Sequence, residues 1–259
     1  MGNVTIITSS NPSMGSGNLV RCKTLAKKLK SPVITRLPVK QGDTMIVDLK
    51  GVKIINLAEL TKPMEMAIMD KRFKTYHDRV KVARDKPKRI IMFLGGYDVD
   101  AVTLKVIDVF IRMDSKIKKT VLVSDNFMHV DKLEKLKKFM KPANIEVITN
   151  AKDIPELIYN ADLAISSGGN MMYEFACVGI PIICLPEDEA EYNLCDQFEH
   201  WGIVKNLGYG TEINNGYLLG HINVLMNSPD KRQNMIDNGK RFVDGKGLER
   251  VLKIIKGEK

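Results

Sequence analysis

The chain has 259 residues, of which 44% are hydrophobic and 27% charged, and this composition is typical of a folded protein with one large or two small domains. No apolar run approaches the roughly 20 residues that cross a bilayer, which excludes a transmembrane helix. The first nine residues lack the charged start and apolar stretch of a signal peptide, so we expect a cytoplasmic protein. A formal net charge of +9 favours anionic partners, while 6% aromatic residues argue against a surface that stacks carbohydrate.

Neither the cysteines nor the histidines form a metal-binding pattern. Four cysteines occupy apolar segments, and no two of them have the spacing of a zinc or redox pair: Cys22, Cys177, Cys184 and Cys195. The four histidines are scattered, and none lies in a glycine-rich turn. We therefore expect reduced core cysteines, no metal site and no cofactor.

The first part of the chain predicts one strand–turn–helix unit and two further strands. The expected elements, in chain order, are a strand at 4–8, a turn at 9–17, a helix after residue 18, strands at 44–47 and 52–57, and an interdomain helix or linker at 71–88. The last of these is rich in Lys and Arg and poor in large apolar residues, as linkers between domains often are.

From residue 89 onward, strand and helix patterns alternate regularly. The expected strands are 90–94, 120–124, 145–149, 163–166 and 181–185, and the expected helices are 99–113, 130–140, 154–159, 169–179, two helices within 217–242, and 247–256. Such alternation is typical of parallel sheets with crossover helices, which indicates an α/β fold. We expect an abbreviated N-terminal domain at residues 1–86 and a C-terminal domain at residues 87–259, since the first part is short for a doubly wound domain.

Three glycine-containing loops follow predicted strands and precede predicted helices. They are centred on Gly15 and Gly17, on Gly96, and on Ser167, Gly168 and Gly169. Glycine lets the backbone approach a phosphate closely, and the helix behind it offers unpaired N–H groups and the positive end of its dipole. The alternative is that these glycines only make the turns.

The third loop carries two polar residues at the start of its helix. Asn170 and Glu174 lie four residues apart, so they project from one face of the helix. A carboxylate there is suited to accept hydrogen bonds from two ribose hydroxyls while the glycine amides hold a diphosphate. The alternative is that Asn170 caps the helix and Glu174 complements its dipole.

Together these residues resemble the donor-nucleotide motif of GT-B glycosyltransferase-like proteins. The segments that carry the resemblance are 161–170, 173–174 and 179–181, with support from 15–18, 93–98 and 244–250. Within that superfamily the pattern is most similar to the group containing the UDP-sugar hydrolase of pseudaminic acid biosynthesis and the spore-coat polysaccharide proteins, with the lipid II transferases more distant.

The resemblance implies two Rossmann-like domains, the first abbreviated, with a UDP-sugar held mainly by the second. It implies that the turn at Ala151 meets the uracil through backbone groups and that Glu174 meets the ribose hydroxyls. The nucleotide-sugar-binding residues that we expect are Gly15, Gly17, Gly96, Ala151, Ser167, Gly168, Gly169, Asn170, Glu174 and Glu191.

The chain departs from that family's pattern at its catalytic positions. Asn18 stands where the hydrolase has a histidine thought to activate the attacking water, and an amide does not take up a proton near neutral pH as imidazole does. Ala190 and Glu191 stand where relatives often carry Asn and Gln. Asp98, Glu189 and Glu191 are candidate replacements for the base, and the alternative is that they are solvated helix caps.

The expected function is processing of a UDP-sugar at its anomeric carbon in surface-glycan biosynthesis, by a hydrolase or a glycosyltransferase. The alternative is a non-catalytic relative that keeps affinity for nucleotide sugars and acts as a partner or regulatory subunit, and Asn18 favours it. Nucleic-acid binding is not expected, because it rests on charge alone. The basic segment 132–141 leaves open a peripheral contact with an anionic membrane or a solvated face, and the short first domain leaves open a second chain that completes it.

Overall fold

The computed structural model describes residues 4–8, 17–30, 33–35, 45–48, 53–56 and 64–256, with side chains described at 21–30 and 64–255. The chain forms two compact units, one of residues 1–75 and 242–259 and one of residues 76–241. The C-terminal segment thus belongs to the same unit as the N-terminal segment. The expected functional domains at 1–86 and 87–259 stay a prediction.

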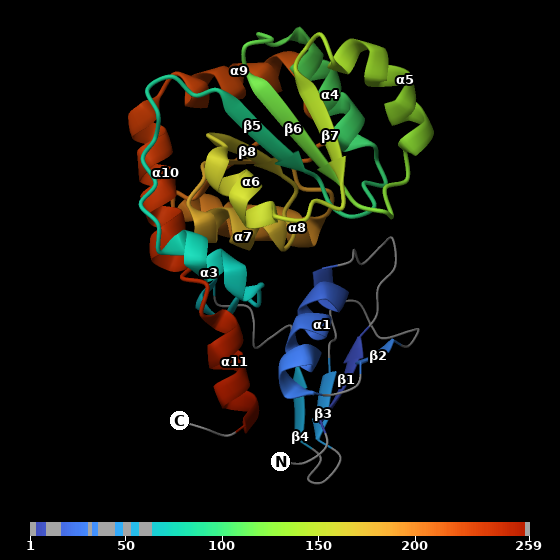
Figure 1. Ribbon diagram of the computed structural model, residues 1–259, viewed down its shortest axis with the longest axis vertical. Helices are drawn as coiled ribbons and strands as arrows, with labels where there is room; N and C mark the ends of the chain where they lie inside the picture. Colours follow the sequence, from blue (N-terminus) through green and yellow to red (C-terminus); the bar gives the residue numbers. More distant parts are fainter. Residues whose placement is uncertain are drawn as a thin grey trace. The chain divides into compact units, whose positions relative to one another are not determined.

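The larger unit is built on a six-stranded parallel sheet (Figure 1). Its strands are β5 (Arg89–Phe93), β6 (Lys118–Val123), β7 (Ile145–Thr149), β8 (Leu163–Ser166), β9 (Ile182–Cys184) and β10 (Val204–Asn206). They lie in the order β10-β9-β8-β5-β6-β7. The expected parallel sheet is therefore confirmed for this unit, including all five strands predicted from the sequence; β10 was not predicted.

Helices cover both faces of this sheet, which explains why its central strands are apolar throughout. The helices are α4 (Val102–Arg112), α5 (Val130–Met140), α6 (Ile154–Asn160), α7 (Met171–Val178), α8 (Glu189–His200), α9 (Asn215–Met226) and α10 (Pro229–Phe242). One core joins the strand residues Ile90 and Met92 to Phe110 of α4, Leu133 of α5 and Ile222 of α9. Figure 1 shows α6, α7 and α8 on the opposite side of the strands.

The smaller unit has a four-stranded mixed sheet in the order β2-β1-β3-β4. Its elements are β1 (Val4–Thr8), α1 (Gly17–Leu29), β2 (Val33–Thr35), β3 (Met45–Asp48), β4 (Lys53–Asn56), the 3₁₀ helix η1 (Met64–Met66), α3 (Lys71–His77, whose last two residues are assigned to the larger unit) and α11 (Gly247–Lys256). Strand β2 is parallel to β1, but β3 is antiparallel to both β1 and β4. The Rossmann-like first domain that the resemblance implies would have a parallel sheet, and the pairing of β3 departs from it; the four residues between β3 and β4 are too few for the crossover connection of a parallel pair.

A small apolar cluster explains why the C-terminal helix belongs to this unit. It joins Cys22 and Leu25 of α1 to Ile68 and to Leu248 and Val251 of α11, and all five side chains are buried. The residues come from three distant parts of the sequence. Helix α11 therefore completes a hydrophobic core that the N-terminal residues share with it.

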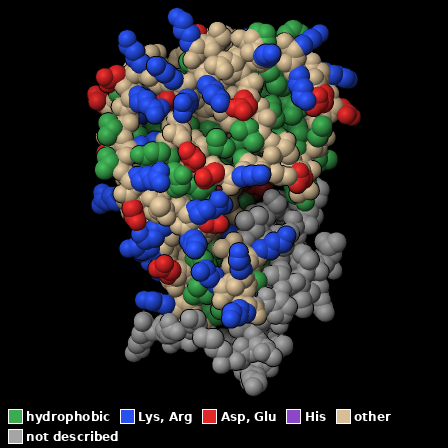
Figure 2. Space-filling model, in the orientation of Figure 1, with side chains coloured by type: hydrophobic (Ala, Val, Ile, Leu, Met, Phe, Trp, Pro, Cys, Tyr) green, Lys and Arg blue, Asp and Glu red, His purple; other side chains and the backbone are tan. Residues whose placement is uncertain are grey.

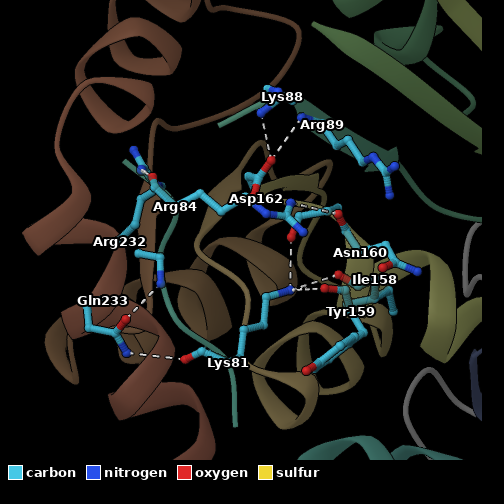
Figure 3. A network of polar contacts seen from close by, with 12 residues as sticks. Lys81, Arg84, Lys88, Arg89, Ile158, Tyr159, Asn160, Asp162, Arg232 and Gln233 are labelled. Carbon is cyan, nitrogen blue, oxygen red and sulfur yellow. Dashed lines mark hydrogen bonds and ion pairs between the residues drawn. The ribbon is translucent and has the colours of Figure 1, made fainter. Parts of the chain in front are cut away.

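An irregular strap, residues 78–88, runs along the larger unit at the amino ends of its strands (Figure 3). The Asp162 carboxylate, which directly precedes β8, accepts hydrogen bonds from the Arg84 guanidinium at 2.7 Å and from the backbone N–H groups of Lys88 at 2.7 Å and Arg89 at 3.0 Å. The expected helix or linker at 71–88 is thus a helix only as far as His77. Its remainder is fixed by polar contacts.

Two basic side chains, the half-buried Lys81 and the buried Arg232, hold the same strap. The Lys81 ammonium donates to the carbonyl oxygens of Ile158, Tyr159 and Ala161 at 2.7–3.1 Å, which satisfies the carboxyl end of α6. Arg232 of α10 is 1% exposed, and its guanidinium donates to the carbonyls at the end of α9 and to that of Arg84. The strap therefore supplies and receives hydrogen bonds at two helix ends of the larger unit.

Candidate functional site

The candidate site lies at the carboxyl ends of β5, β8 and β9. The chain leaves β5 toward β6 and β7 on one side and returns to β8, β9 and β10 on the other, so its direction reverses between β5 and β8. This is the strand order of dinucleotide-binding domains, in which ligands bind in the crevice where the order reverses. The loops that follow β5 and β8, two of the three singled out from the sequence, meet at this point.

The turn after β8 packs closely against the start of α8. A Cβ on Gly168 would lie 2.5 Å from Cβ of Glu191 and 2.7 Å from its carbonyl oxygen, so only glycine fits. The neighbouring Ser167 is 2% exposed, and its carbonyl oxygen accepts a hydrogen bond from the Cys195 thiol at 3.3 Å. Glycine at 168 is thus required by packing, which is a reason that the sequence did not reveal.

The donors of this turn are directed at a carboxylate. Oε1 of Glu191 accepts from the Ser167 hydroxyl at 3.2 Å, and Oε2 accepts from the backbone N–H of Glu187 at 3.0 Å. The backbone N–H of Gly168 also donates to this carboxylate, and burial nevertheless raises the pKa of Glu191. The turn therefore binds an anion in this structure, and the anion belongs to the chain itself. Because Glu191 is engaged in this way, the geometry does not favour it as a general base.

Asp98, the other candidate base, caps a helix. It is 1% exposed, and its two carboxylate oxygens accept from the backbone N–H groups of Val102 at 2.8 Å and Thr103 at 2.9 Å, at the start of α4. Burial raises the pKa of Asp98, against these hydrogen bonds. The geometry supports the alternative that Asp98 caps a helix, although this cap is buried and not solvated. Glu189 begins α8 and is exposed.

Replacement of Asp98 by alanine should destabilise the larger unit by about 2 kcal/mol, since two buried N–H groups at the start of α4 lose their acceptor. Urea unfolding followed by circular dichroism measures this loss. Asp100→Ala, which removes an exposed carboxylate from the same loop, is the matched control and should unfold within about 0.5 kcal/mol of the wild type. Equal midpoints for the two variants would remove the structural role assigned to Asp98.

Glu187, in the loop after β9, is a residue that the sequence did not single out. Its Oε1 atom is buried and has no hydrogen-bond partner among the described residues. That atom lies 3.1 Å from where a Cβ on Gly95 would be, and Gly95 has a φ of +77°. Burial, followed by the charges of Glu191, Asp98, Asp100 and Asp188, raises the pKa of Glu187 to about 8. The signal that would have found it is its position after a buried strand next to β8.

Of the remaining predicted residues of the larger unit, Asn170, Glu174 and Gly96 lie near the ends of β8 and β5, whereas Ala151 lies farther away. Asn170 precedes α7 and makes no side-chain cap, and Glu174 lies half-buried in the first turn of that helix, so both stand beside the Ser167 turn. The carbonyl oxygen of Gly96 accepts a hydrogen bond from the Ser124 hydroxyl. Ala151 follows β7, and since β5 and β6 lie between β7 and β8, strand spacing places it roughly 14 Å from the Ser167 turn.

The predicted residues of the smaller unit cannot be placed in a site. Gly15 lies outside the described residues, and so does the side chain of Asn18, although the backbone of α1 begins at Gly17. Their assignments stay predictions.

The four cysteines lie in the core, as expected from the sequence. They are buried thiols without a disulfide between them, which confirms the expected core role.

No helix in the described part of the chain has the length and apolar character needed to cross a membrane. On the face shown in Figure 2, Lys and Arg are dispersed among acidic side chains instead of forming one stripe. Contact of the lysines of α5 with an anionic membrane stays a prediction.

Comparison with known proteins supports the fold and names a family. The spore coat polysaccharide biosynthesis protein SpsG of Bacillus subtilis (strain 168) is 28% identical over 170 residues, which are 65% of this chain and 50% of that protein. The chain thus spans about half the length of this relative.

Solved structures show the same arrangement of strands and helices. MurG of Acinetobacter baumannii superposes with a TM-score of 0.55 at 16% identity, covering 69% of this chain and 55% of MurG. A mutant of S. aureus TarM in complex with Fondaparinux, alpha-GlcNAc-glycerol and UDP superposes with a TM-score of 0.52 at 12% identity, covering 69% of this chain and 37% of TarM. The expected resemblance to GT-B glycosyltransferase-like proteins is confirmed.

The family described as "Protein of unknown function (DUF354)" matches residues 45–211, which include β5 to β10 and the loops that follow β5, β8 and β9. The chain therefore belongs to this family, and its fold is GT-B glycosyltransferase-like.

Proposed function

We propose that the protein binds a UDP-sugar at the carboxyl ends of β5, β8 and β9 and processes it at the anomeric carbon, as a hydrolase or glycosyltransferase of surface-glycan biosynthesis. The observation that carries this proposal is the Ser167 turn, placed where the strand order reverses and followed directly by the amino end of α7. Similarity to a spore coat polysaccharide biosynthesis protein supports the pathway.

The diphosphate and the ribose would each have a partner in this arrangement. The amides at Gly168 and Gly169 and the dipole of α7 would hold the diphosphate, which carries negative charge that grows as the sugar departs. Glu174 would accept hydrogen bonds from the ribose hydroxyls. Because the Ser167 turn holds the Glu191 carboxylate in this structure, the phosphate would take the place of that side chain.

Calorimetric titration with UDP, UDP-N-acetylglucosamine and UMP tests the site before any assumption about chemistry. We expect UDP to bind more tightly than UMP, because UMP lacks the second phosphate. The affinity should depend little on salt, in contrast to nucleic-acid binding, which weakens steeply as salt rises. Failure of all three nucleotides to bind would contradict the proposal.

Glu174→Ala should raise the dissociation constant of UDP about 10- to 100-fold, since each hydrogen bond to a carboxylate is worth about 1.5–3 kcal/mol. The matched control is Glu156→Ala, which removes an exposed carboxylate from the first turn of the neighbouring helix α6 and should leave binding unchanged. Unchanged affinity in Glu174→Ala would overturn the ribose assignment.

A second function, a partner or regulatory protein that binds nucleotide sugars without turning them over, is favoured by the described carboxylates. Asp98 is a helix cap and Glu191 is held by the Ser167 turn, so neither is placed as a base. Release of UDP from a panel of UDP-sugars separates the two functions. Binding without release would favour the partner protein.

A further inference from the structure

The carboxyl ends of β8 and β9 carry two buried polar atoms without a hydrogen-bond partner among the described residues. They are the Ser166 hydroxyl, in a residue 1% exposed at the end of β8, and Oε1 of Glu187, in the loop after β9. Ser166 is in register with Cys184, the last residue of β9, so both atoms belong to the same edge of the sheet. A buried polar atom left unpaired costs about 1–3 kcal/mol, so such atoms call for an explanation.

The two ends of Glu187 differ in how they are held. Its backbone N–H donates to the Glu191 carboxylate at 3.0 Å, which fixes the start of the side chain beside the Ser167 turn. Its Oε1 lies 3.1 Å from where a Cβ on Gly95 would be, so the carboxyl group occupies the space that a side chain at position 95 would need. The carboxyl group therefore lies between the loops that follow β5 and β8, where the strand order reverses.

The charged groups that act on Glu187 are all acidic. Asp98 and Asp100 come from the loop after β5, Asp188 precedes α8, and Glu191 lies in the first turn of that helix. Ionisation of Glu187 is disfavoured by burial and by these neighbouring carboxylates, which together raise its pKa to about 8. Near pH 7 the carboxyl group is accordingly protonated, and it carries one O–H donor.

We propose that Glu187 contacts the bound nucleotide, and that its carboxyl O–H donates a hydrogen bond to an oxygen of the diphosphate. This inference rests on the proposed function, because it names a further ligand-contacting residue of the same site. The proton stays shared between Glu187 and the phosphate oxygen, and no bond of the nucleotide is made or broken. The contact would give Oε1 the partner that it lacks among the described residues and would let a diphosphate bind at an acidic site.

A hydrogen bond donated by protonated Glu187 would make the affinity for UDP depend on pH. As pH rises through about 8, Glu187 ionises, its donor is lost, and its new charge repels the diphosphate. From pH 7 to pH 9 the protonated fraction of a group with this pKa falls about tenfold, so the affinity of the wild type for UDP should fall about tenfold. At pH 8.5, where the phosphates of UDP are already fully ionised, binding should take up about half a proton or more from the buffer.

Glu187→Gln is the diagnostic variant, because the amide keeps a donor of the same size but does not ionise. Titration calorimetry with UDP at pH 7, 8 and 9, in buffers of different ionisation enthalpy, measures both affinity and proton uptake. We expect Glu187→Gln to bind UDP with an affinity that changes less than about twofold over this range and without proton uptake at pH 8.5. The matched control, Glu156→Gln at an exposed position in the first turn of α6, should keep the wild-type profile.

The outcomes separate this inference from the proposed function. Wild-type binding that is independent of pH, or a pH dependence that persists in Glu187→Gln, would overturn the inference and leave the proposed function standing. No binding of UDP to the wild type at any of these pH values would overturn the proposed function, and the inference with it. Thermal unfolding of each variant at each pH shows that the titrations compare folded proteins.

Discussion

Gly168→Ala is expected to destabilise the larger unit by about 2–4 kcal/mol and to abolish measurable UDP binding. The new Cβ would lie 2.5 Å from Cβ of Glu191, 2.7 Å from its carbonyl oxygen and 2.8 Å from its Cα. Two of these are backbone atoms of α8, whose first turn is fixed by the hydrogen bond from the Glu191 N–H to Asp188 at 2.8 Å. Because the contacted atoms of α8 include backbone and cannot rotate away, the turn after β8 must move away from the helix, and this movement costs stability.

Gly169→Ala is the matched control. A Cβ there would meet Oε1 of Glu191 at 3.3 Å and the Ser167 hydroxyl at 3.9 Å, and both are atoms of side chains. We expect a loss of less than about 1 kcal/mol in urea unfolding. If the two variants unfold at the same urea concentration, the close packing of the turn against α8 is not what requires glycine at 168.

Asp162→Asn is expected to lower the free energy of unfolding by about 2–4 kcal/mol. The wild-type carboxylate is 8% exposed and accepts from Arg84 and from the backbone N–H groups of Lys88 and Arg89 (Figure 3). An amide offers one oxygen in place of two, so its NH₂ group would face a donor, and the Arg84 guanidinium would lose its counter-charge. Chemical unfolding of the full chain measures the loss.

The control for Asp162 lies on the strap itself. Asp85→Asn removes an exposed carboxylate next to Arg84 and should change the free energy of unfolding by less than about 0.5 kcal/mol. Because the Arg84 side chain is half-exposed, most of the Asp162 effect should come from the two backbone donors. An Asp162→Asn variant as stable as Asp85→Asn would show that the strap is not held by these contacts.

The sequence predicted the larger unit well because its signals are local. Apolar runs such as 90–94 and 163–166 indicated buried strands, and the turn residues between them indicated where the helices begin. Strand direction in the smaller unit was missed, since β-branched runs at β3 and β4 do not encode which way a strand points. The membership of α11 in that unit depends on contacts with Ile68 and α1, which are distant in sequence.

The candidate site was predicted in position but not in detail. Ser167 and Gly168 were identified as a ligand-binding turn, yet the requirement for glycine at 168 comes from α8, about 20 residues later. Asp98 follows β5 as expected, but its role as a cap depends on the backbone conformation there, where its φ is 47°. Glu187 was missed because its protonation follows from carboxylates on two loops. Burial and charge at a site are tertiary properties.

Amide chemical shifts recorded during a titration with UDP test most directly whether a nucleoside diphosphate binds where β5, β8 and β9 end. We expect the largest changes within 95–98, 167–170 and 187–191, with small changes at the strap, 78–88, on the amino side of the same sheet. Changes concentrated at the strap or on α5, or a spectrum that UDP leaves unaltered, would contradict this expectation.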